Sequence, residues 1–167
     1  MNTAVYRPLQ ITDYRTYLFA SLFIVGNIIL PQLAHLVPNG GFIFLPIYFF
    51  TLIAAYRYGI VAGLLTAVLS PLANHWLFAM PPAEVLPVIL TKSVLLAVAA
   101  SFAAKYFKQV SILALLSVVL AYQIVGTAVE WAILKDFSVA ISDFRIGLPG
   151  MLLQVFGGYV FLKALAK

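Results

Sequence analysis

The fold of this chain is decided by an uncharged stretch from Thr16 to Tyr56, which reads TYLFASLFIVGNIILPQLAHLVPNGGFIFLPIYFFTLIAAY. As a single helix this stretch would be about 60 Å long, twice the ~30 Å hydrocarbon core of a bilayer. The run Pro38-Asn39-Gly40-Gly41 interrupts it, and such a run is typical of a turn. The stretch therefore predicts two membrane-spanning helices, at about residues 14–36 and 42–56.

The composition of the whole chain also indicates a membrane protein. Of 167 residues, 64% are hydrophobic and 9% are charged, whereas an ordinary soluble domain has roughly 25% charged residues. A water-soluble fold could not hide so much apolar surface. No polar stretch is long enough to form a second folded unit, so we expect one all-α membrane domain over residues 1–167. Its first apolar segment has no small-residue cleavage site, and we expect a permanent span there.

Four more spans are expected after Arg57. They lie at about 58–78, with a kink or early end near Pro71, and at 84–107, 110–134 and 147–165. Between the last two, the residues from Lys135 to Arg145 are expected to form a polar loop of mixed charge. The sequence thus predicts a bundle of six transmembrane helices.

The positions of the basic residues predict the orientation of this bundle. Alternating spans place Lys135 and Arg145 on one side and seven other basic residues on the opposite side: Arg7, Arg15, Arg57, Lys105, Lys108, Lys163 and Lys167. The positive-inside rule then places both termini in the cytoplasm. Topology accounts for the formal charge of +5, so we do not expect nucleic acid as a partner.

Two ionisable residues, Lys92 and Glu130, lie inside predicted spans. Charges at membrane depth are costly and often functional. Three interpretations are open: a salt bridge within the bundle, a role in binding a polar solute, or side chains that extend to the interface.

The segment Asn74-His75-Trp76 opens a loop rich in aromatic and hydrogen-bonding groups. Trp76 suits either an interfacial aromatic belt or a surface that stacks on a flat ligand. A metal site is not expected, because the chain has no cysteine and His35 is the only other histidine. No common hydrolase or phosphoryl-transfer motif occurs, so an enzyme is not expected.

Several small residues are spaced by four, such as Gly59 with Gly63 and Ala99 with Ala103. In lipid, such pairs mark faces where helices approach closely. These faces are interpreted either as contacts within the bundle or as a docking face for a partner membrane protein.

Two segments together resemble the S components, the substrate-binding subunits, of energy-coupling factor (ECF) vitamin transporters. The first is FLPIYFFTLIAAYRYGIVAGLLTAVLSPLANHWLFAMPPAEVLPVIL, Phe44–Leu90. It is similar to the family's run of a Pro-led helix 2, a Tyr-Arg-Tyr-Gly or Gly-Pro-x-x-Gly hinge, a Gly-rich helix 3 ending in Ser-Pro, then Met-Pro-Pro and Leu-Pro. The second, GLPGMLLQ at Gly147–Gln154, looks like the start of helix 6 in that family. The resemblance covers about residues 14–164.

This resemblance implies a bacterial inner-membrane protein that captures a vitamin or related micronutrient from outside. It would dock on a transmembrane coupling subunit driven by two ATPase subunits, which use the ATP, and would need no cofactor of its own. The loop His35–Gly41 would be a lid, and external parts of helices 4 to 6 with loops 1, 3 and 5 would form the pocket. The substrate-binding candidates are Asn39, Asn74, His75, Trp76, Lys92, Glu130, Trp131 and Gln154.

The chain departs from the family pattern at two places. Related members often carry a carboxylate at the helix 4 position of Lys92, and a cation there favours a carboxylate, a phosphate or an electron-rich ring unless Glu130 neutralises it. Helix 1 lacks a clean Ala-x-x-x-Ala pair for docking and offers Ala20, Ser21 and Gly26 instead. The sequence leaves the substrate open among thiamin precursors, pyridoxine, pterins, cobalamin and others. The alternatives are a small membrane enzyme acting on a lipid or quinone, and a non-catalytic assembly subunit.

Overall fold

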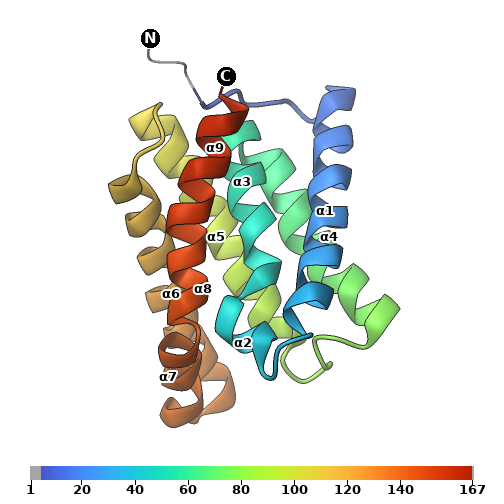
Figure 1. Ribbon diagram of the computed structural model, residues 1–167, viewed down its shortest axis with the longest axis vertical. Helices are drawn as coiled ribbons and strands as arrows, with labels where there is room; N and C mark the ends of the chain where they lie inside the picture. The colour runs from blue at the N-terminus through green and yellow to red at the C-terminus, as the bar shows by residue number, and fades with distance from the viewer. Residues whose placement is uncertain (1–4, 167) are drawn as a thin grey trace.

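The computed structural model describes residues 5–166, with the side chain of Asp143 left out, and within these residues the chain is helical with no strand (Figure 1). The elements are α1 (Tyr14–Ala34), α2 (Gly40–Phe44), η1 (Pro46–Tyr48), α3 (Phe49–Tyr58), α4 (Ile60–Phe78), α5 (Leu86–Phe107), α6 (Ile112–Leu134), α7 (Phe137–Ile146), α8 (Leu148–Leu152), η2 (Leu153–Gly157) and α9 (Gly158–Leu165). Six segments are long and apolar enough to cross a bilayer, with Gly40–Tyr58 and Leu148–Leu165 each counted as one. Six spans are what the sequence predicts.

The second span is built of three pieces rather than the single helix predicted over 42–56. It begins at Gly40 and breaks at Leu45, whose φ of 47° places it in the left-handed region. Pro46 then starts a short 3-10 turn, because proline has no N–H to continue the helix that precedes it. The break brings α2 against α8, where a Cβ on Gly150 would lie 2.4 Å from the carbonyl carbon of Phe44.

One local prediction differs from the structure. The residues from Lys135 to Arg145, expected as a loop, contain α7, whose first turn is capped because the Asp136 carboxylate accepts bonds from the backbone N–H groups of Ser138 and Val139 at 2.9 and 3.2 Å. Helix α4 spans Ile60–Phe78, close to the predicted 58–78, and it contains Pro71 without ending there.

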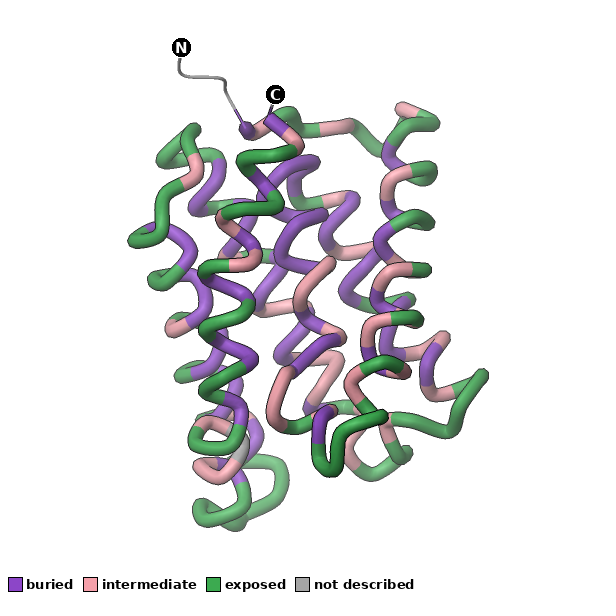
Figure 2. The backbone as a smooth tube through the Cα atoms, viewed as in Figure 1, coloured by how far each residue is buried: buried purple, intermediate pink, exposed green. Residues whose placement is uncertain are grey.

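Helix α3 lies at the centre of the bundle, and α1 lies at its edge (Figures 1 and 2). All residues of α3 from Thr51 to Tyr58 are buried, and α3 packs against α1, α4, α5 and α9. By contrast, α1 exposes a long row of apolar side chains, including Leu18, Leu22 and Val25. A membrane protein can expose such a row, because lipid tails are as apolar as leucine.

Both ends of the described chain lie at the same end of the bundle (Figure 1). The buried Arg57 side chain helps to hold them there, since its guanidinium donates hydrogen bonds to the carbonyls of Val5 and, at 3.1 Å, of Leu165. The backbone N–H of Arg7 also donates to the Arg57 carbonyl, at 2.8 Å. The first and last described segments are therefore joined through the central helix.

Candidate substrate-binding site

Lys92 of α5 and Glu130 of α6 form a buried ion pair. The Lys92 Nζ lies 2.6 Å from Glu130 Oε2, and the two side chains are 2% and 7% exposed. Gly126 allows the two helices to come this close, because a Cβ there would lie only 2.6 Å from Lys92 Cγ. Of the three interpretations left open by the sequence, the structure has the salt bridge, and neither side chain extends to the surface.

Several buried polar side chains on the same two helices have no hydrogen-bond partner among the described residues. Both amide atoms of Gln123, the hydroxyl of Thr127 and the hydroxyl of Ser93 are buried in this way. Gln123, Thr127 and Glu130 are spaced by four and three residues on α6, so they share one face of that helix. Unpaired polar groups are expensive in a membrane interior, so this face suits a polar ligand.

Gln154 extends the polar site toward the sixth span. It lies on η2, a single π-helical turn between α8 and α9, and it is fully buried. The Tyr122 hydroxyl donates to Gln154 Oε1 at 2.9 Å, while Gln154 Nε2 has no partner among the described residues. The Tyr122 ring also lies against the Tyr48 ring, with centroids 5.5 Å apart. π-Helical turns are frequent at functional sites because they re-aim a side chain.

We call this group of buried side chains the α5–α6 cluster; it consists of Lys92, Ser93, Tyr122, Gln123, Thr127, Glu130 and Gln154. It combines a cation, an anion, amides and hydroxyls inside an apolar bundle. Such groups can bind and orient a polar solute by hydrogen bonds. Of these seven residues, Lys92, Glu130 and Gln154 are among the candidates named from the sequence, whereas Ser93, Tyr122, Gln123 and Thr127 are not. The i, i+4, i+7 spacing of Gln123, Thr127 and Glu130 in an otherwise apolar helix was the available signal.

Asn74 belongs to a different group of buried residues, which we call the α1–α3–α4 network: Asn27, Thr51, Ser70 and Asn74. The Asn27 amide donates to Thr51 Oγ1 at 3.1 Å and to Ser70 Oγ at 3.2 Å, and its Oδ1 accepts from the Phe50 N–H at 3.2 Å. The Asn74 amide donates to the carbonyls of Asn27 and Ser70, both at 2.9 Å. This network joins three helices through bonds between protein groups, and within it Asn74 Oδ1 has no partner among the described residues.

The other predicted binding residues lie outside both groups. His75 Nδ1 is 2.7 Å from the Pro81 carbonyl, a contact that ties the end of α4 to the following loop. Trp76 is 84% exposed, and Asn39 is exposed in the turn before α2. Trp131 is half exposed and packs edge-on against Phe137 at 5.5 Å. Among the described residues, no three His, Cys, Asp or Glu side chains gather where they could hold a metal ion.

The three residues predicted to dock a partner lie on different sides of α1. Ala20 is 2% exposed and faces the bundle. Gly26 packs on Phe50, whose ring would lie 2.7 Å from an added Cβ. Ser21 is exposed beside Leu18 and Leu22. Of the three, Ser21 therefore lies on the lipid-facing side of the helix.

Comparison with models of known protein families, with curated proteins and with solved structures gives no match. The six apolar helices indicate a multi-pass membrane protein. The finer assignment to the S components rests on the sequence resemblance described above.

Proposed function

We propose that this protein is the substrate-binding subunit of a micronutrient uptake system, in the manner of the ECF S components, and that the α5–α6 cluster binds the solute. The observation that carries the proposal is the set of unpaired buried atoms on Gln123 and Thr127, which share a face of α6 with Glu130 of the ion pair. Leaving such groups unpaired costs free energy, which hydrogen bonds from a bound solute would offset.

The position of the cluster supports a site that opens away from the termini. Lys92 lies six residues from the start of α5 and Glu130 four residues from the end of α6. At 1.5 Å per residue, both are within about 9 Å of those helix ends. With the termini in the cytoplasm, as the positive-inside rule favours, these ends face the outside of the cell.

The chemistry of the cluster favours a small, flat, polar solute without a large net charge. Lys92 and Glu130 neutralise one another, so a strongly anionic ligand gains less than it would beside a lone cation. The amide of Gln123 can both donate and accept. The rings of Tyr48 and Tyr122 provide aromatic surface nearby. A vitamin-sized heterocycle that carries amide or hydroxyl groups matches these features.

The partners follow from the same proposal. A coupling subunit with two ATPases would supply the energy, and this chain would deliver the bound solute. The exposed side of α1 around Ser21 offers a lipid-facing surface for the coupling subunit. The exposed loop from His35 to Asn39, next to α2, would close over the occupied site.

A matched pair of substitutions tests the site. The purified protein would be screened by thermal shift against vitamins and their precursors, and the affinity of each hit measured by calorimetry. Thr127→Val should weaken binding of the hit about tenfold, because the bound compound would lose its hydrogen bond to the Thr127 hydroxyl. Thr66→Val is the control, since the Thr66 hydroxyl is buried in α4 and donates to the Ala62 carbonyl at 2.9 Å.

Binding should also slow hydrogen exchange in residues 35–41, which form the expected lid. If no compound binds and native mass spectrometry finds no co-purified small molecule, the protein is not a solute-binding subunit and the assembly-subunit alternative stands. If a compound binds but both threonine variants behave alike, the site lies elsewhere in the protein.

A further inference from the structure

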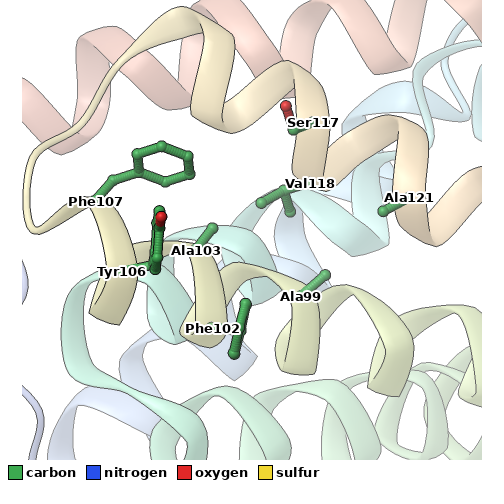
Figure 3. A pocket seen from close by; sticks show the side chains of 8 residues that line it. All are labelled: Ala99, Phe102, Ala103, Tyr106, Phe107, Ser117, Val118 and Ala121. Atoms are coloured by element: carbon green, nitrogen blue, oxygen red, sulfur yellow. The ribbon is translucent and has the colours of Figure 1, made fainter.

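An apolar groove lies between α5 and α6 (Figure 3), and its inner end at Ala121 is next in sequence to Tyr122 of the α5–α6 cluster. Its volume is about 340 Å³, within the ~300–1,000 Å³ range of small-molecule sites. The lining residues are Ala99, Phe102, Ala103, Tyr106 and Phe107 of α5 and Ser117, Val118 and Ala121 of α6. No charged side chain is among them.

The groove arises from the arrangement of small and large side chains. Ala99 with Ala103, and Ser117 with Ala121, are spaced by four on the two facing helices and leave little bulk between them. The rings of Tyr106 and Phe107, packed edge to face at 5.1 Å, stand at one end of the groove (Figure 3). Ala121 lies at the other end.

The groove faces the surroundings of the bundle and not its core. Tyr106 is 74% exposed and Phe102 is 72% exposed. Ala103 and Val118 form the buried floor. In a bilayer, the substance that fills such a lipid-facing hollow is an acyl chain.

Two cations lie beside the aromatic end of the groove. Lys105 and Lys108 flank Tyr106 and Phe107 in sequence, and both are exposed. Neither has an ion-pair partner among the described residues. Basic groups at the end of a cleft between membrane helices attract anionic lipid headgroups. The two lysines therefore favour an anionic headgroup, and the apolar groove binds the acyl chain of the same lipid.

We propose that this groove is a binding site for an anionic phospholipid, with one acyl chain between α5 and α6 and the phosphate near Lys105 and Lys108. None of the groove's lining residues belongs to the α5–α6 cluster. If each lysine contributes about fivefold to the affinity, as is typical near a membrane surface, the preference for an anionic over a zwitterionic headgroup should be about 25-fold.

Native mass spectrometry of the purified full-length protein would test this, with phosphatidylglycerol and phosphatidylcholine of identical acyl chains as the two probes. Glycerol phosphate, which has no acyl chain, would be the third. Phosphatidylglycerol should be retained about 25-fold more tightly than phosphatidylcholine, and glycerol phosphate should not bind. Equal retention of the two lipids, or binding of glycerol phosphate alone, would overturn the proposal.

Two kinds of variant separate the charge from the groove. The double variant Lys105→Gln/Lys108→Gln should reduce phosphatidylglycerol retention to the level of phosphatidylcholine, while Lys135→Gln, a cation at the opposite end, should not. Ser117→Phe should block the groove and lower retention of phosphatidylglycerol at least tenfold, while Ala128→Phe, on the same helix and also exposed, should leave it unchanged.

Circular dichroism and thermal unfolding would establish that each variant is folded. A phosphatidylglycerol with a photoreactive acyl chain should label peptides from residues 99–121 in the unaltered protein. This measurement does not depend on any substitution. Labelling confined to other helices, or an unchanged lipid preference in the double lysine variant, would show that the groove is not the site.

Discussion

The two groups of buried polar side chains in this bundle differ in how completely they are satisfied. In the α1–α3–α4 network, the Asn27 side chain uses its amide on Thr51 and Ser70 and its oxygen on the Phe50 N–H. In the α5–α6 cluster, Gln123 is equally buried but neither of its amide atoms has a partner among the described residues. Both groups lie in spans that are apolar enough to cross a bilayer, so an apolar environment by itself does not explain the difference.

The difference separates a structural role from a binding role. A polar group whose bonds are made by the protein holds helices together, because breaking those bonds in lipid is costly. A polar group left without protein partners contributes nothing to that purpose and is available to a ligand. The α1–α3–α4 network fastens the peripheral α1 to the bundle, whereas the α5–α6 cluster is suited to hold a solute.

The largest effect is expected from breaking the ion pair. Lys92→Ala or Glu130→Ala alone leaves a buried charge uncompensated and should lower the free energy of unfolding by about 3–5 kcal/mol. The double variant Lys92→Met/Glu130→Leu should recover most of this stability but not substrate binding. Unfolding curves in mixed detergent micelles, compared with binding titrations, would show both effects. Single variants as stable as the unaltered protein would mean that the pair does not form.

Two glycines test whether close packing serves stability or the site. A Cβ on Gly63 would lie 2.6 Å from Ala55 Cβ and 2.9 Å from its Cα, so Gly63→Ala should force α3 and α4 apart and cost about 1–3 kcal/mol. Gly126→Ala meets the Lys92 side chain, which can shift, so its stability cost should be smaller. Only Gly126→Ala should weaken substrate binding. Equal effects of the two variants on affinity would contradict this.

Removing the Asn27 side chain, the centre of the α1–α3–α4 network, should reduce stability without changing the affinity for substrate. Asn27→Ala leaves the Phe50 N–H without its acceptor and should cost about 1–2 kcal/mol. Thermal unfolding would measure the loss, and hydrogen exchange should rise in α1 first. The affinity for substrate should stay within twofold. A larger change in affinity would place this network in the binding site.

The smallest expected effect is an increase in stability, whereas the other substitutions lower it. Gln123→Leu removes two unpaired buried polar atoms and should stabilise the empty protein by about 1 kcal/mol. The same change should weaken substrate binding at least tenfold. Unfolding curves would detect the higher stability of the variant, and calorimetric titrations would detect its weaker substrate binding. A destabilised Gln123→Leu variant would show that the amide serves the fold.

Much of the architecture could be predicted because the bilayer restricts it so strongly. Its thickness requires two spans between Thr16 and Tyr56, and the cost of buried charge marks Lys92 and Glu130 as exceptional. Their salt bridge was one of the interpretations that the sequence left open. Helix α7 was not predicted, because its apolar residues are too few for a span and its start depends on the local cap at Asp136.

The site was predicted less completely than the fold, for a different reason. Asn74 and Gln123 are both polar residues in apolar helices, and nothing local distinguishes them. Their roles depend on which atoms face them across helix contacts. Those contacts follow from the rotation and approach of each helix, which in turn depend on small residues such as Gly126 and on breaks such as the one at Leu45.

The sequence by itself therefore determined the environment, the number of spans and the rarity of buried charge, because each follows from the free energy of moving single residues into lipid. Only the tertiary structure decided that the Asn27 side chain is fully bonded, that Gln123 and Thr127 have no partner among the described residues, and that α5 and α6 leave a groove near Lys105. Hydrogen bonds and packing act over a few ångströms between residues far apart in the chain, so they exist only once the helices have taken their places.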